Sequence, residues 1–385
     1  RQNREKLTLQ KNDPMYKNDS RTVITLDAGG TNFVFSAMRG CEFIVEPVTY
    51  PSNSDNLDRC LATMVRGFEE IISRLDSAPV AISFAFPGPA DYRAGIIGGY
   101  LPNFPSFRDG VALGPFLRQR FGIPVFINND GDLFAFGEAN AGALPEINAR
   151  IKAMGGKRHY RNLLGYTFGT GLGIGSVVNG ELNLGNNSCV ETFCLRHKHN
   201  PDIIAEEGAS IRAIRREYGR LSGDTAHELT PYDIFLMAED LREGDRDAAV
   251  KAFELFGEIA GDAFATAATL TDSLIVVGGG LTGAMKYIKP ALIRELRSEL
   301  HTVGGEAVRR VQTEVFDLDD ENEFARFVAG ASRPLAVYGT NTYVDYDPMK
   351  RTGVIVSKLG ASKAISVGAY VYALSEIDKS EHSDN

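Results

Sequence analysis

The most constraining segment of this sequence is residues 23–32, which read VITLDAGGTN. A short apolar strand leads into Asp-x-Gly-Gly-Thr, and a second apolar run over residues 33–38 follows at once. Two apolar runs joined by a glycine pair predict a tight β-hairpin. Gly29 and Gly30 at its tip let backbone N–H groups approach an anion closely, because no Cβ stands in the way.

Polar groups surround this predicted turn. Thr31 and Asn32 follow the glycines and add donors, while Asp27 ends the first strand. A carboxylate at the end of a buried strand is costly unless a cation or a donor accompanies it. A phosphate with Mg²⁺ would satisfy all of these groups together. The alternative is a plain hairpin turn in which Asp27 is a capping residue.

Composition excludes several classes of protein. The chain has 385 residues, 43% of them apolar, which is enough for two domains with large cores. The net charge of -9 argues against a basic nucleic-acid-binding surface. Four cysteines are too few for a disulfide scaffold, which favours a reduced cytoplasmic location. No apolar run is long enough to span a bilayer, so no membrane partner is expected.

Strand and helix patterns alternate along the chain, which predicts an α/β fold. We expect residues 1–20 to form a polar N-terminal arm or disordered leader. Residues 21–140 are expected to form a smaller α/β domain, completed by a C-terminal helix over 363–376. Residues 141–362 are expected to form a larger α/β domain, which begins after a Gly- and Pro-containing stretch near 137–145. The predicted strands are the two of the hairpin over 23–38, followed by 41–48, 80–86, 125–128, 163–168, 174–178 and 273–277. The predicted helices are 57–75, 113–121, 131–140, 204–218, 231–242, 246–270, 284–300 and 364–374.

Three further motifs stand at strand ends or hairpin tips. An apolar strand ends in Asn128-Asn129-Asp130, residues 169–173 read GTGLG between two strands, and residues 278–280 are three glycines after a strand. Each has a structural alternative: a helix N-cap for Asp130, a hairpin turn and a strand-to-helix connection. Their joint occurrence favours a ligand site, because open α/β sheets bind ligands at the carboxyl ends of strands.

Together these motifs resemble the ROK family of sugar kinases, within the hexokinase, Hsp70 and actin superfamily. The similarity covers residues 22–376. It rests on Asp-x-Gly-Gly-Thr at 27–31, Asn-Asp before Gly-Glu at 129–138, Gly-Thr-Gly-x-Gly at 169–173 and the triple glycine at 278–280. The resemblance implies a two-domain actin-like ATPase fold, ribonuclease H-like, with a cleft between the domains. It also implies a homodimer.

The resemblance also implies roles for individual residues. Asp130 would be the catalytic base that takes the proton of a sugar hydroxyl, and Asp27 would orient Mg²⁺ directly or through water. The implied sugar-binding residues are Gly88, Asn103, Asn129 and Glu191. The implied ATP-binding residues are Gly29, Gly30, Thr31, Asn32, Thr170, Gly171, Gly279 and Gly280.

One part of the chain departs from the family pattern. The family usually has Gly-Glu-x-Gly-His, in which the histidine also binds zinc, but here Glu191 is followed by Cys194 in place of that histidine. The zinc-binding cysteine run of the family is absent. Cys189, Cys194, His197 and His199 offer four nitrogen and sulfur ligands. Zinc there is one alternative, and a metal-free loop, which we favour, is the other.

The sequence thus predicts an ATP-dependent, Mg²⁺-requiring kinase that phosphorylates a hydroxyl of a hexose or an amino sugar, similar to glucokinases and N-acetylhexosamine kinases. A sugar-responsive transcription regulator is one alternative, although about twenty residues before the first strand are too few for a DNA-binding module. A catalytically silent sugar sensor is the other.

Overall fold

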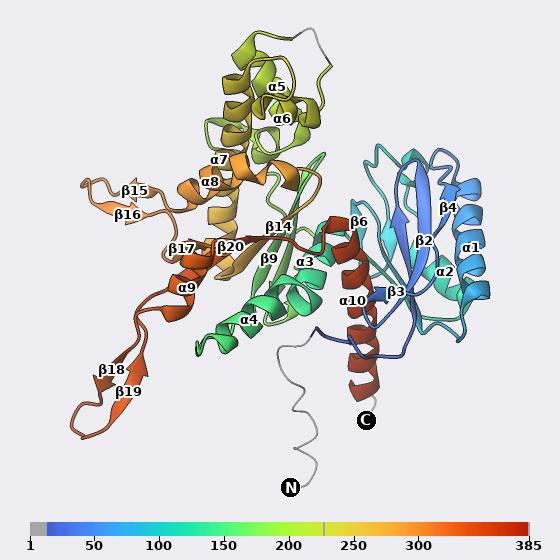
Figure 1. Cartoon of the computed structure of the whole chain (residues 1–385). Coiled ribbons are helices and arrows are strands. Elements are labelled where there is room, and N and C mark those ends of the chain that lie inside the picture. Colours follow the sequence, from blue (N-terminus) through green and yellow to red (C-terminus); the bar gives the residue numbers. More distant parts are fainter. Residues whose placement is uncertain (1–13, 226–227, 384–385) are drawn as a thin grey trace. The chain divides into compact units, whose positions relative to one another are not determined.

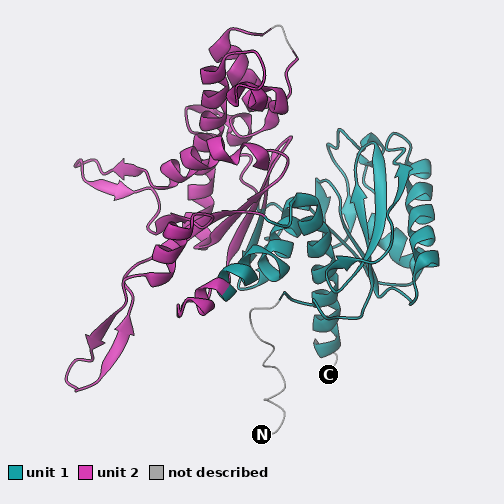
Figure 2. Cartoon of the chain, in the orientation of Figure 1, with its two compact units in different colours: residues 1–149, 175–190, 358–385 teal, residues 150–174, 191–357 magenta. Residues whose placement is uncertain are grey.

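The fold was analysed in a computed structural model, which describes residues 14–225 and 228–383. Its chain forms two compact units, shown in Figures 1 and 2. Unit 1 comprises residues 1–149, 175–190 and 358–385, and unit 2 comprises residues 150–174 and 191–357. The domain bounds expected from the sequence stay a prediction, because compact units need not be independently folding domains.

Unit 1 is built on a six-stranded sheet in the order β3-β2-β1-β5-β8, with β4 paired to β2. The strands are β1 (Val23–Ala28), β2 (Asn32–Arg39), β3 (Glu42–Phe43), β4 (Val48–Pro51), β5 (Ala81–Ala85) and β8 (Val125–Asn128). β1 and β2 form the predicted antiparallel hairpin, whereas β1, β5 and β8 are parallel. The carboxyl ends of these three strands therefore lie at one edge of the sheet.

Aromatic side chains fill the core between this sheet and helix α1 (Leu57–Arg74). The Phe35 and Phe68 rings lie 5.1 Å apart, edge to face. Asn56 caps α1 by accepting a hydrogen bond from the Arg59 N–H, and α2 (Leu113–Phe121) ends at Gly122 in the left-handed region. Both helices confirm the predicted periodicity, since their apolar residues face the sheet.

Two helices of unit 1 pack at glycine positions. A Cβ on Gly137 of α3 (Asp130–Ala141) would lie 2.2 Å from the Ala364 carbonyl of α10 (Ala361–Ser383), and one on Gly368 would lie 1.8 Å from the Leu133 carbonyl. Only glycine permits so close a helix crossing. The Gly- and Pro-containing stretch near 137–145, after which the larger domain is expected to begin, is mostly helical: α3 continues to Ala141, and α4 (Ala143–Ala153) follows after one residue.

The second sheet has the order β11-β10-β9-β14-β20-β17. Its strands are β9 (Leu163–Phe168), β10 (Leu172–Val178), β11 (Glu181–Leu182), β14 (Leu274–Gly278), β17 (Glu314–Asp317) and β20 (Arg351–Val356). β9, β14, β20 and β17 are parallel, and their buried apolar runs match that arrangement. The long helix α7 (Arg246–Thr271) contributes to the core of unit 2, where the Phe264 and Tyr166 rings stack at 3.7 Å.

The remaining elements refine several predictions. The expected helix over 204–218 begins only at 211, because β13 (Asn200–Ile204) and a short 3₁₀ turn precede α5 (Ile211–Ser222). The expected strand over 41–48 divides into β3 and β4. The other elements are β6 (Ala90–Asp91), β7 (Ile96–Ile97), β12 (Arg196–His197), α6 (Pro231–Ala238), α8 (Met285–Leu296), β15 (Glu299–His301), β16 (Ala307–Arg309), α9 (Glu321–Ala329), β18 (Arg333–Ala336) and β19 (Tyr343–Tyr346). Across residues 14–225 and 228–383, no helix is long and apolar enough to cross a membrane.

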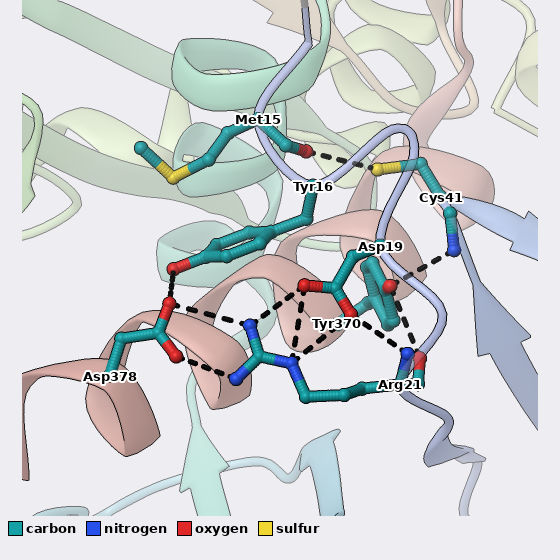
Figure 3. A network of polar contacts seen from close by, with 8 residues as sticks. Met15, Tyr16, Asp19, Arg21, Cys41, Tyr370 and Asp378 are labelled. Atoms are coloured by element: carbon teal, nitrogen blue, oxygen red, sulfur yellow. Dashed lines mark hydrogen bonds and ion pairs between the residues drawn. The ribbon is translucent and has the colours of Figure 1, made fainter. Parts of the chain in front are cut away.

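Residues 14–20 pack against α10 through polar contacts, which differs from a free leader (Figure 3). The Tyr16 hydroxyl donates to Asp378 at 2.7 Å, and the Arg21 guanidinium bridges Asp19 and Asp378 at 2.7 and 2.6 Å. The Cys41 thiol donates to the Met15 carbonyl at 3.4 Å. Partial burial opposes ionisation of Asp378, but the bonds from Arg21 and Tyr16 lower its pKa. The rest of the predicted arm, residues 1–13, lies outside the described residues.

Candidate active site

A pocket of about 380 Å³ lies within unit 1 at the carboxyl ends of β1 and β5. Four elements supply its walls: the β1–β2 turn, the loop after β5, the start of α3 and the first turns of α10. This is the position at which open α/β sheets bind ligands. Its lining residues are Thr25, Leu26, Asp27, Ala28, Gly29, Gly30, Ala85, Phe86, Pro87, Asn103, Phe104, Asp130, Ser362, Ile365, Ser366 and Ala369.

Asp27 and Asp130 are the two carboxylates of this pocket. Both keep exposed surface toward it. Protein atoms surround Asp130 on its other sides, and this desolvation raises the pKa of the carboxyl group. The N–H groups of Gly131 and of Asp130 itself oppose the shift, and the negative charge of Asp27 adds to it. A carboxylate with a raised pKa accepts a proton more readily than an ordinary aspartate, as a general base requires.

The residue that caps α3 is Asn129, whose side-chain oxygen accepts from the Gly131 N–H at 2.8 Å. Asp130 is instead the first helical residue and also accepts from the Gly131 N–H, at 2.8 Å. Asp130 is therefore not the N-cap of α3, because the Asn129 side chain already has that role. The Asn129 amide also donates to the Tyr92 hydroxyl at 3.4 Å, which fixes its orientation.

The β1–β2 turn is held from behind by two serines that the sequence did not reveal. The Ser52 and Ser54 hydroxyls both donate to the Gly30 carbonyl, the latter at 3.0 Å. A Cβ on Gly30 would lie 2.9 Å from the Asn103 Cβ, so the turn and the Asn103 loop touch. Neither Gly29 nor Gly30 has positive φ. The glycines are therefore needed for close approach and not for a left-handed turn.

The loop after β5 brings Asn103 to the pocket, as predicted from the sequence. Pro87 lines the pocket beside Gly88, where a Cβ would lie 3.0 Å from the Tyr92 hydroxyl. Two α10 hydroxyls, on Ser362 and Ser366, were missed. No local signal in the sequence connects this last helix with the first hairpin, because the contact depends on the tertiary fold.

The second glycine-rich turn, between β9 and β10, lies in unit 2, where a carboxylate braces it. The Leu172 N–H donates to Glu206 at 3.1 Å, and a Cβ on Gly171 would lie 2.7 Å from the same oxygen. Arg212, on α5, donates to the Thr170 carbonyl at 3.2 Å and to Glu206 at 3.1 Å. The turn is thus tied to α5 by a charge pair that sequence analysis missed.

The predicted adenosine-binding glycines follow β14 in the same unit. Gly279 has φ +101°, and a Cβ there would lie 2.4 Å from the Phe168 carbonyl at the end of β9. The Thr282 hydroxyl donates to the Gly279 carbonyl at 3.0 Å. A Cβ on Gly280 would meet nothing within 4 Å, so its backbone is accessible.

The two histidines of the alternative zinc site, His197 and His199, have other partners. In the described part of the chain, no group of three or more His, Cys, Asp or Glu side chains could hold a metal ion. The His199 ring contacts Glu258 at 3.1 Å, and His197 Nδ1 accepts from the N–H groups of His199 and Asn200. Glu191 is half-buried. Burial of Tyr166 raises the pKa of its hydroxyl, and the negative charge of Glu191 adds to this shift.

Two glycine-rich turns, a basic carboxylate at a strand end and a second carboxylate in the same pocket are the parts that phosphoryl transfer needs. The mixed α/β architecture is that of the two-domain actin-like ATPase fold, and the fold and site define a phosphotransferase of that class.

The chain belongs to the ROK family. The ROK family model matches residues 23–193. The crystal structure of a glucokinase from Parabacteroides distasonis is 57% identical, has a TM-score of 0.87 and covers 94% of this chain and 99% of its own. A glucokinase from Thermotoga maritima is 24% identical over 293 residues, which is 68% of this chain and 83% of that protein.

A more distant structure shares the fold. It is a ROK family glucokinase from Streptomyces griseus in complex with glucose and AMPPNP, with 20% identity and a TM-score of 0.55. The alignment covers 91% of this chain and 98% of that one. The predicted family and fold class are confirmed.

Proposed function

We propose that this chain is an ATP-dependent sugar kinase whose substrate is glucose or a closely similar hexose. The observation that carries the proposal is the pairing of Asp130 and Asp27 in one pocket with the Gly29–Gly30 turn. Glucose is the first candidate because the 57% identical structure is a glucokinase. The pocket volume of about 380 Å³ lies within the range of small-molecule sites.

In the proposed reaction Asp130 accepts the proton of the attacking sugar hydroxyl. A hydroxyl is a poor nucleophile, and removal of its proton during attack on the γ-phosphate contributes about 10²–10⁴-fold in rate. Asn103, Asn129, Gly88 and Glu191 are proposed to bind the other sugar hydroxyls. The bond between Asn129 and Tyr92 supports this role, because it holds the amide in one orientation.

Backbone N–H groups of the two turns are proposed to bind the ATP phosphates. The exposed side chains of Thr31 and Asn32 add donors at the first turn. The proposed nucleotide-binding residues are Gly29, Gly30, Thr31, Asn32, Thr170 and Gly171 for the phosphates, and Gly279 and Gly280 for adenosine.

Mg²⁺ fits the carboxylates of the pocket. A hard cation that keeps several water ligands needs only one or two protein carboxylates together with phosphate oxygens, and Asp27 faces the pocket as one of them. When bound, the ion would offset the charge that develops on the phosphates. Zinc is not part of the proposal, because the histidines of the Cys189–His199 segment have other partners.

The wider proposal follows from the same site. The partners are ATP and a small-molecule sugar, with no nucleic acid and no membrane, and the assembly is a homodimer. The location is the cytoplasm, where ATP is available and where the thiols of Cys41 and Cys60 stay free. We also keep the proposed domains, 21–140 with 363–376 and 141–362.

A coupled assay of ADP release with a panel of sugars tests the proposed function. We expect release that depends on both Mg²⁺ and a sugar, with glucose among the best substrates. Binding of a sugar without phosphorylation, with active P. distasonis glucokinase as the positive control, would contradict the proposal and favour a silent sensor. Binding of DNA that a sugar releases would indicate a regulator instead.

A further inference from the structure

Two β-hairpins of unit 2 have every residue exposed. One joins β15 and β16 after α8, and the other joins β18 and β19 between α9 and β20 (Figures 1 and 2). Residues 299–309 and 331–346 are exposed without interruption. Both hairpins project from the helices and strands of their unit in Figure 1. Neither hairpin was predicted from the sequence.

Each hairpin nevertheless has an apolar face. Leu335 stands opposite Val344 in the β18–β19 register, and Leu300 stands opposite Val308 in the β15–β16 register. Cross-strand partners point to the same face of a two-stranded ribbon. Tyr346 shares the face of Leu335 and Val344, because its partner Arg333 is two residues from Leu335.

An isolated two-stranded hairpin is only marginally stable in water unless a face is covered. Here the tips carry fully exposed apolar residues, Tyr338 at 101% and Val303 at 111% relative exposure. The outer strands also present unpaired backbone groups, which soluble proteins normally protect. Two hairpins built in this way point to a surface that is covered when the protein is assembled.

The base of the longer hairpin is fixed to its own unit on the other face. Asp345, which lies on the face opposite to Leu335, forms an ion pair with Lys157. Asp347 forms an ion pair with the Arg351 guanidinium at 2.8 Å and accepts a hydrogen bond from the Ala331 N–H at 3.2 Å. These contacts hold the β18–β19 hairpin at its base while its apolar face stays exposed.

We propose that a second copy of this chain covers these faces, so that two copies associate through the β18–β19 and β15–β16 hairpins. Area favours a second copy over an unrelated partner. Tyr338 at the tip is 101% exposed, and Tyr346, Leu335 and Val344 on the apolar face are 40%, 43% and 52% exposed. A fully buried aromatic side chain contributes about 150–250 Å². One hairpin therefore offers several hundred Å², whereas a stable interface takes roughly 800 Å² from each partner. In a two-fold symmetric dimer every contact occurs twice, so two hairpins from each copy can together bury that area.

Sedimentation of the full chain with matched variants tests this interface. We expect the wild type to be a dimer, Leu335→Asp to be a monomer, and Tyr338→Ala to weaken association at least tenfold. Ala336→Asp is the control, because Ala336 is on the opposite face of the same strand and should leave the dimer intact.

Sugar phosphorylation and circular dichroism show whether each variant is folded, since none of these residues is in the proposed active site. A monomeric wild type would overturn the proposal. So would a Leu335→Asp variant that stays as dimeric as Ala336→Asp. Loss of the dimer by Leu335→Asp with activity retained would support it, and the proposed kinase function does not enter this result.

Discussion

At the scale of single residues, the environment of Asp130 combines a proposed catalytic role with a cost in stability. Desolvation first, and the charge of Asp27 next, raise the pKa of this carboxyl group. A group with a raised pKa in the folded state binds more protons there than in the unfolded chain. Stability therefore falls as the pH rises from the ordinary value of 3.8 through the raised pKa.

Asp130→Asn should consequently make the protein more stable at neutral pH. We expect a higher melting temperature, because the amide removes a charge whose formation the folded state disfavours. The difference should vanish in acid, where the wild-type carboxyl group is protonated in both states. Calorimetric scans at neutral and acidic pH check this, and a variant that melts below the wild type at neutral pH would refute it.

The pH dependence of the rate should report the same environment. The acidic limb of kcat should lie above the pH expected for an ordinary aspartate, because the base must be ionised. Asp27→Asn should move the limb of the remaining activity toward lower pH by removing a repulsive charge. An Asp109→Asn variant, changed at an exposed loop position, should leave the limb in place.

Gly30→Val should abolish ATP binding while the protein stays folded. The new side chain would press on Asn103, whose Cβ would be 2.9 Å from the added Cβ, and its branches would occupy the space in front of the turn. We expect nucleotide affinity to fall by at least 100-fold by calorimetry. Gly304→Ala, where the nearest atom would be 3.6 Å away, is the control. Unchanged nucleotide affinity in folded Gly30→Val would refute the role of this turn.

At the scale of elements, the second glycine-rich turn depends on α5. Glu206 accepts a hydrogen bond from the turn, whereas the neighbouring Glu207 pairs with Arg212 and Arg216. Glu206→Gln should raise KM for ATP by about tenfold, a change near 1.4 kcal/mol. KM for the sugar should change little. Glu207→Gln is the matched control, and equal effects of the two variants would contradict the bracing role.

The limits of sequence reasoning also appear at this scale. The helices over 57–74 and 113–121 were predictable, because their apolar residues recur at helical spacing. The start of α5 was not, because the 3₁₀ turn before it carries residues that also favour helices. Sequence motifs predicted four of the residues that line the pocket: Asp27, Gly30, Asn103 and Asp130. Ser362 and Ser366 could not be predicted, because α10 reaches the pocket only through long-range packing.

At the scale of the whole molecule, the two ends of the described chain meet within unit 1. Tyr16, Arg21 and Asp378 form one network (Figure 3). The lowered pKa of Asp378 means that its contribution is present above the ordinary value of 3.8 and is lost as the pH falls through the lowered one. Asp378→Asn should cost about 1 kcal/mol at neutral pH, since the partners are partly exposed. Urea unfolding measures this, with Asp109→Asn as a control expected to match the wild type.

The account as a whole rests on Asp130 acting as the base in phosphoryl transfer from ATP to a sugar. The most direct test is glucose-dependent ADP formation by the wild type and by Asp130→Asn, with glucose and ATP affinities measured by calorimetry on the same samples. We predict that Asp130→Asn binds both ligands like the wild type and that its kcat is lower by about 10²–10⁴-fold. A variant that keeps most of its kcat would contradict the account.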